Sequence, residues 1–156
     1  MRSLLAAVVA ILAIPFVSAH YTFPNIFVNG TLTGEWEYVR MTANHYDQGP
    51  VTDLNSQAIR CYEDSTASAG NAKIATVTAG STVGFKASNT MGHPGYFSAY
   101  MSKAVPAANS NDAGKGSSWF KIWEWAPKYS SSTGLVFDSM NINQFTFTFP
   151  RNTPYG

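Results

Sequence analysis

The chain has 156 residues, of which 12% are charged and 14% aromatic, and its formal net charge is +1. This near-neutral balance gives no reason to expect a nucleic acid or an anionic membrane as a partner. Few charges with many Tyr, Trp and Phe side chains suit a protein that meets a neutral, hydroxyl-rich surface such as a polysaccharide, and they suit an ordinary β-rich core equally well.

Residues 1–19 have the pattern of a secretion signal. A basic residue precedes an apolar run over residues 4–17, and small residues lead to a cleavage position after Ala19. The run is shorter than the roughly 20 apolar residues of a spanning helix; a buried helix or a membrane anchor is the alternative interpretation. We therefore predict a secreted, extracellular protein with a signal peptide in residues 1–19 and one domain in residues 20–156, which begins with His20 after cleavage.

Strand patterns dominate the remaining sequence. Strands are expected over residues 21–28, 73–78, 82–86, 97–102, 119–125 and 143–149, with Gly-, Ser-, Asn- or Pro-rich loops over 49–50, 65–71, 107–118 and 130–134. No window after residue 20 has a convincing helical period. Short strands separated by turn signals predict an all-β fold, an antiparallel β-sandwich.

Two of the predicted elements are more specific. Residues 73–78 and 82–86 flank an Ala-Gly-Ser turn at 79–81, which predicts a hairpin. Residues 143–149 alternate cleanly, with three phenylalanines on one face and threonines on the other, which predicts a half-buried strand. Because such a face needs neighbours and only a short tail follows it, we expect the sandwich to be incomplete at its C-terminal end.

Two positions bear on covalent modification. The single cysteine, Cys61, is unusual because secreted domains generally carry paired cysteines. A buried thiol, an intermolecular bridge and a missing disulfide partner are all open at this point. The sequence Asn29-Gly30-Thr31 is a glycosylation sequon, so we expect a glycan on Asn29.

The histidines are His20, His45 and His93. A chain that starts at His20 has an α-amine beside its imidazole, and both nitrogens can bind one metal ion, since an α-amine has a pKa of about 7.7–8. His93 lies in a Gly-His-Pro-Gly turn, which is stiff enough to hold its ring as a third nitrogen ligand, although a surface histidine is the alternative. Three nitrogens in a T favour copper and leave positions open for oxygen chemistry. His45, in a loop, is given no role.

Short motifs extend through residues 20–156 in a fixed order. They are HYTFPN (20–25), WEYVR (36–40), PVTDLNS (50–56), IRC (59–61), HPG (93–95), AYMSKA (99–104), WFKI (119–122) and TPYG (153–156). In this order they resemble the fungal cellulose-active lytic polysaccharide monooxygenases, auxiliary activity family nine, formerly glycoside hydrolase family sixty-one.

The resemblance implies a function and a site. The expected fold is an immunoglobulin-like β-sandwich whose flat face docks on cellulose or a related β-glucan. One copper ion is expected on the amine and ring of His20 and the ring of His93, which makes these the catalytic and metal-binding residues. An external electron donor with oxygen or hydrogen peroxide as co-substrate is expected to drive oxidation at C1 or C4 of the β-1,4-glucan. We expect a monomer.

The chain also departs from the family pattern. A proline is expected where this chain has Tyr96, which is either an extra stacking residue or a surface substitution. The family chain continues beyond residue 156 and there carries the disulfide partner of Cys61, an axial tyrosine on the copper, and histidine and glutamine residues around it. The resemblance thus implies a truncated chain, whether a fragment, a mis-assigned gene end or a splice form. A noncatalytic extracellular module that binds copper or glucan is the alternative function.

Aromatic side chains on a flat face can stack on sugar rings. Tyr21, Tyr46 and Tyr96 are the candidate substrate-binding residues, with plain packing or surface roles as the alternative. The tryptophans at 119, 123 and 125 are expected in the core.

Overall fold

The computed structural model describes residues 20–62, 71–116 and 118–154. The predicted signal peptide in residues 1–19 lies outside the described residues, as do most of the predicted loop at 65–71 and one residue of the loop at 107–118. Within the described ranges, no helix is long and apolar enough to cross a membrane.

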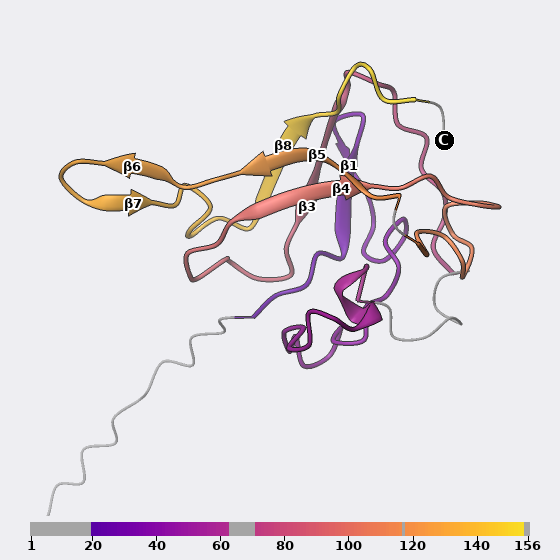
Figure 1. Ribbon diagram of the computed structural model, residues 1–156, viewed down its shortest axis with the longest axis horizontal. Coiled ribbons are helices and arrows are strands. Elements are labelled where there is room, and N and C mark those ends of the chain that lie inside the picture. Colours follow the sequence, from indigo (N-terminus) through magenta and orange to yellow (C-terminus); the bar gives the residue numbers. More distant parts are fainter. Residues whose placement is uncertain (1–19, 63–70, 117, 155–156) are drawn as a thin grey trace, which may run out of the picture.

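The described residues form short antiparallel strands and one 3-10 turn (Figure 1). These are β1 (Asn25–Val28), β2 (Thr31–Leu32), η1 (Gln57–Ile59), β3 (Thr82–Lys86), β4 (Phe97–Met101), β5 (Phe120–Trp125), β6 (Lys128–Ser130), β7 (Gly134–Val136) and β8 (Gln144–Thr148). One sheet has the order β2-β1-β3-β8, and β4-β5 and β6-β7 each form a pair. The all-β prediction is confirmed.

The four-stranded sheet is built around β3. Its register pairs Ile26 of β1 with Phe85 and pairs Val83 with Phe147 of β8, so both edges of β3 are occupied. The predicted hairpin between residues 73–78 and 82–86 is therefore wrong. The turn itself forms, with the Ser81 N–H donating to the Thr78 carbonyl at 3.0 Å, but the chain before it is not a strand.

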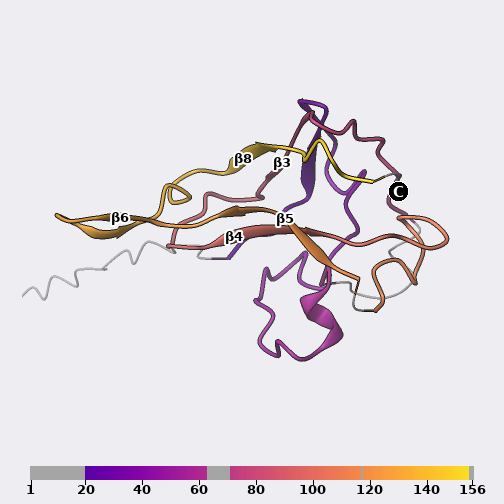
Figure 2. The same ribbon diagram turned by 45° about the horizontal axis from the view of Figure 1, so that its top comes forward.

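The β4-β5 pair lies alongside the β3 and β8 strands of this sheet (Figure 2), and aromatic rings join the two. Trp123 of β5 stacks on Phe147 of β8, with ring centroids 4.5 Å apart and planes 9° apart, and on Phe145 at 5.3 Å. Phe23 contacts Phe145 edge-on at 5.9 Å between centroids, and Phe97 contacts it with tilted rings at 5.3 Å. The predicted phenylalanine face of residues 143–149 is thus confirmed as an interior face.

Strand β5 contains an irregularity that matters for the site. Ala99 of β4 pairs with Trp123, and the next residue, Tyr100, pairs with Lys121, so Ile122 is left without a partner. This is a β-bulge, in which one strand has an extra residue and its side-chain alternation shifts. The bulge explains why residues 119–125 alternate only in part.

The β6-β7 pair forms a hairpin that projects from the body in both views (Figures 1 and 2). Tyr129 and Leu135 lie opposite each other in its register, and both are exposed. The loop predicted at 130–134 lies at its tip. A second tight hairpin joins β1 to β2 through Asn29 and Gly30, whose φ angles of 50° and 84° suit an Asn-Gly turn.

Candidate functional site

The N-terminal end of the described chain lies beside the segment that leads to His93. The Thr22 N–H donates to the Ser88 Oγ at 3.1 Å, and the Ser88 N–H donates to the Thr22 carbonyl at 2.9 Å. The Asn89 Nδ2 donates to the His20 carbonyl at 3.5 Å. These contacts fix the backbone of residues 20–22 while the His20 side chain stays exposed.

The turn that carries His93 is attached to the segment before β8. Met91 is fully buried; its N–H donates to the Ile142 carbonyl at 2.8 Å and its carbonyl accepts from the Asn141 N–H at 2.9 Å. On the far side of the turn, the buried Ser139 hydroxyl donates to the Gly95 carbonyl at 3.0 Å. His93 is exposed between these two attachments.

The two histidine-bearing segments meet through Tyr21. Its ring centroid lies 6.0 Å from that of His93, with the planes 31° apart, and 5.5 Å from that of Phe23. Partial burial raises the pKa of the Tyr21 hydroxyl. The fold therefore brings the residue next to His20 against the ring of His93, although 73 positions separate the two histidines along the chain.

The donor chemistry at this point suits a nitrogen-bound metal ion. Among the described residues, no group of three or more His, Cys, Asp or Glu side chains is placed to hold a metal. The rings of His20 and His93 would supply two nitrogen donors. An α-amine at His20 would supply a third without another side chain. Such an all-nitrogen donor set favours copper over the hard cations.

Comparison with known proteins identifies the family. Residues 20–156 match the model of Auxiliary Activity family 9 (formerly GH61). The chain belongs to this family. The resemblance inferred from the ordered motifs is thereby confirmed, and the match begins at His20 itself.

Curated AA9 proteins are similar over nearly all of this chain. It is 52% identical over 152 residues to AA9 family lytic polysaccharide monooxygenase D of Phanerodontia chrysosporium, covering 96% of this chain and 64% of that protein. It is 46% identical over 158 residues to monooxygenase H of Malbranchea cinnamomea, covering 100% and 66%. It is 41% identical over 143 residues to monooxygenase A of Thermothielavioides terrestris, covering 91% and 61%. The AA9 chain thus spans less than two thirds of the length of each of these relatives.

The third histidine of the AA9 chain lies in a separate loop. The His45 ring is 3.7 Å from that of Tyr46 and 6.4 Å from that of Trp36, and its Nδ1 lies 2.8 Å from the Thr42 carbonyl oxygen. This loop is nevertheless connected to the site, because the Gln48 Oε1 accepts from the Asn89 Nδ2 at 2.9 Å. The Gln48–Asn89 contact was not predicted from the sequence; two amides 41 positions apart give no local pattern.

Tyr46 and Tyr96 are both available at the surface of the AA9 chain. Tyr46 is 89% exposed and Tyr96 is 50% exposed. Tyr96 is also held by polar contacts: its hydroxyl donates to the Glu124 Oε2 at 2.5 Å and accepts from the Lys121 Nζ at 3.3 Å. The bond to Glu124 raises the pKa of the Tyr96 hydroxyl.

The predicted modification sites are both at the surface. Cys61 is exposed, in the loop after η1. Asn29 is exposed, and its side chain donates to the Thr76 carbonyl and accepts from the Thr78 N–H, each at 3.1 Å. The disulfide of Cys61 and the glycan on Asn29 stay predictions.

Proposed function

We propose that this AA9 chain is secreted, is cleaved before His20, and acts as a copper-dependent monooxygenase that cleaves β-1,4-glucan chains such as cellulose. The observation that carries the proposal is the meeting of the N-terminal segment with the His93 turn through Tyr21. The family match that starts at residue 20 supports cleavage after Ala19, because the matched region would then coincide with the mature chain.

In this proposal three nitrogens hold the metal: the α-amine and ring of His20 and the ring of His93. When bound, copper supplies the one-electron chemistry by which an external donor and oxygen or hydrogen peroxide oxidise a C–H bond at C1 or C4 of the glucan. The Asn89 side chain donates to the His20 carbonyl, and the Tyr21 ring lies beside the His93 ring.

Substrate binding is proposed on the exposed surface rather than in an enclosed pocket. His20 and His93 are both exposed, which suits a polymer that cannot enter a closed site. Tyr21, Tyr46 and Tyr96 are the proposed ring-stacking residues, since tyrosine offers an apolar face and a hydroxyl to a neutral sugar. The near-zero charge balance of the chain agrees with a neutral partner.

The experiment is to secrete the chain from a fungal or yeast host with its own residues 1–19 and to determine the N-terminal residue by intact mass. The purified protein is titrated with Cu²⁺, examined by electron paramagnetic resonance, and incubated with cellulose and a reductant. We expect an N-terminus at His20, one copper ion with nitrogen couplings, and oxidised oligosaccharides in the mass spectrum of soluble products.

Three variants isolate the proposed ligands. His20→Ala and His93→Ala are expected to lose stoichiometric copper binding, as is a version that retains Ala19 before His20. His45→Ala is the matched control and should bind like the wild type, because its ring belongs to the separate loop with Tyr46. Equal binding by wild type and His93→Ala would overturn the copper site. Copper binding without oxidised products would favour the second candidate, a noncatalytic extracellular module that binds copper or glucan.

A further inference from the structure

We infer that Tyr96 is a positioning residue for His93. In this arrangement Lys121 and Glu124 of β5 hold the Tyr96 hydroxyl, and Tyr96 in turn fixes the end of the turn that presents the His93 ring. The inference rests on the proposed role of His93 as a metal ligand, and it concerns how this chain keeps that ligand in place.

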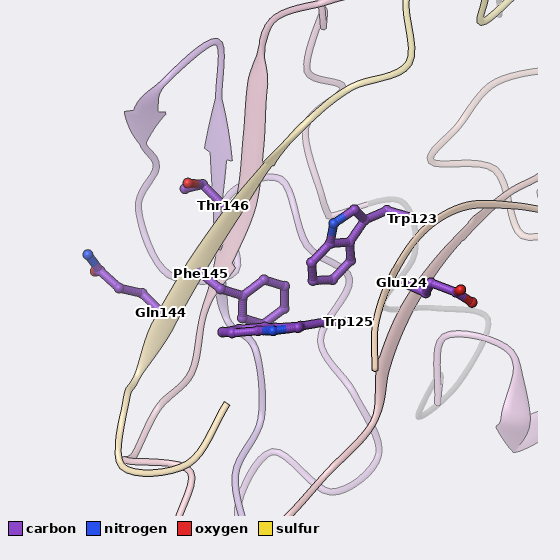
Figure 3. A pocket seen from close by; sticks show the side chains of 6 residues that line it. All are labelled: Trp123, Glu124, Trp125, Gln144, Phe145 and Thr146. Atoms are coloured by element: carbon purple, nitrogen blue, oxygen red, sulfur yellow. The ribbon is translucent and has the colours of Figure 1, made fainter. Parts of the chain in front are cut away.

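The β-bulge at Ile122 makes the arrangement possible. In a regular strand, residues three apart point to opposite faces. Lys121 and Glu124 are three apart, yet their side chains meet, with the Lys121 Nζ and the Glu124 Oε2 2.5 Å apart. Figure 3 shows Trp123 and Trp125 turned toward Phe145 while Glu124 points away from them. The bulge therefore brings a lysine and a glutamate together on the outer face.

The Tyr96 hydroxyl fits between these two charges. It donates its proton to the Glu124 carboxylate and accepts from the Lys121 ammonium, so both of its hydrogen-bonding roles are used. Lys121 Nζ also lies 6.0 Å from the centroid of the Tyr96 ring. Hydrogen bonds to charged groups are stronger than those between neutral groups. A phenylalanine at this position would retain the ring and lose both hydrogen bonds.

This network completes the attachment of the His93 turn. Met91 fixes the start of the turn through the backbone of residues 141 and 142, and Ser139 holds Gly95. Tyr96 joins the end of the turn to β5, which packs its tryptophans on β8. His93 is thus held between two layers of the fold. The Tyr96 contacts thus add a polar attachment between Gly95, which Ser139 holds, and Phe97, which pairs with Trp125 of β5.

If the Tyr96–Lys121–Glu124 network served only general stability, its removal would have different effects from those expected of a positioning role. Exposed ion pairs contribute little to folding free energy, and the side chains of Lys121 and Glu124 are 41% and 52% exposed. If the network serves only the surface, removing it should change neither the turn nor the metal affinity. If it positions His93, the loss should be local to residues 92–96 and should appear in copper binding.

The test compares Tyr96→Phe with Tyr100→Phe. Tyr100 is a tyrosine of the neighbouring strand β4 with almost the same exposure, 52% against 50%. Cu²⁺ affinity is measured by competition titration on the secreted chain that begins at His20. Changes to residues that orient metal ligands cost about 10–100-fold in affinity. We expect Tyr96→Phe to weaken binding about tenfold, at the low end of that range, and Tyr100→Phe to leave it unchanged.

A rescue variant and a metal-free measurement complete the test. Glu124→Gln keeps an oxygen that can accept from Tyr96, so it should retain most of the affinity, whereas Glu124→Ala should behave like Tyr96→Phe. In the copper-free chain, amide hydrogen exchange at residues 92, 93, 95 and 96 should accelerate several-fold in Tyr96→Phe and Glu124→Ala only. Thermal midpoints of all four variants should stay close to that of the wild type.

The outcomes separate this inference from the proposed function. If the wild type binds copper through His93 and Tyr96→Phe matches it in affinity and exchange, the positioning role is wrong and the copper site stands. If the wild type and His93→Ala bind copper equally, the copper site is wrong, and the exchange data alone then decide whether Tyr96 holds the turn. A uniform rise in exchange over the whole chain in Tyr96→Phe would show a global role and would also refute the inference.

Discussion

The two faces of β5 make different kinds of contact: the inner face is apolar and half-buried, and the outer face is polar and exposed. On the inner face, Trp123 stacks on Phe147 and joins the two sheets. On the outer face, Lys121 and Glu124 hold Tyr96 through exposed polar contacts. The inner contacts bury apolar area and determine whether the sheets pack at all. The outer contacts add little to folding but determine where a turn is held, so fold and site can be perturbed separately.

The largest effect is expected on the inner face, from Phe147→Ala. Phe147 is only 8% exposed and its ring is stacked on Trp123, so truncation removes buried area and leaves a cavity between the sheets. Phenylalanine-to-alanine changes in cores cost about 3–5 kcal/mol. Urea unfolding followed by tryptophan fluorescence measures the loss.

The control for this change lies on the projecting hairpin. Tyr129 is 79% exposed, so Tyr129→Ala should stay within about 0.5 kcal/mol of the wild type. Equal losses from Phe147→Ala and Tyr129→Ala would mean that the stacked aromatic layer does not hold the sheets together.

A smaller loss is expected from Gly84→Ala, within the four-stranded sheet. A Cβ at this position would lie 2.1 Å from the Phe145 carbonyl oxygen and 2.7 Å from the Thr146 Cα, so the backbone of β3 or β8 would have to shift. Overpacking of this kind typically costs about 1–3 kcal/mol. Gly49→Ala is the matched control, since its nearest neighbour would be the Asp47 Oδ1 at 3.5 Å. A Gly84→Ala protein as stable as Gly49→Ala would show that the two strands separate at little cost.

The difference between the faces also explains what the sequence could predict. The phenylalanine alternation at 143–149 is a local pattern, and it predicted β8 and its buried face correctly. The choice of partners for β3 is not local. A Gly-containing turn at 79–81 suggested pairing with residues 73–78, but β1 and β8 occupy both edges of β3.

The same distinction between local patterns and non-local contacts applies to the candidate site. Glycine and proline around His93 predicted a turn, and the motif order predicted the family. The Tyr96 network was not predicted, because it depends on a bulge that puts residues three apart on one face. The partial alternation of 119–125 was the available signal, because a strand that breaks its period contains an irregularity, and the polar residues on either side of it can then share one face.

The smallest effect is expected from lowering the pH, which protonates Glu124 on the outer face of β5. Lys121 lowers the pKa of the Glu124 carboxyl most, followed by the hydrogen bond from Tyr96. Because the pKa of Glu124 is lowered in the folded chain, its contribution to stability is complete above the ordinary glutamate pKa of about 4.3. That contribution is lost as the pH falls through the lowered pKa.

The amide signal of Tyr96 in the copper-free chain is expected to report this titration, with a midpoint below about pH 4.3. Glu124→Gln removes the titrating group and should abolish the step. Two other carboxyl groups also have lowered pKa values: Glu37 through hydrogen bonds from the Gly34 N–H and then from Lys73, and Asp112 through Lys115. Both are retained in Glu124→Gln, so their titrations cancel in the comparison. A midpoint at or above the ordinary glutamate value would mean that Lys121 and Tyr96 do not hold the carboxylate in solution, and the outer face of β5 would then be an ordinary solvated surface.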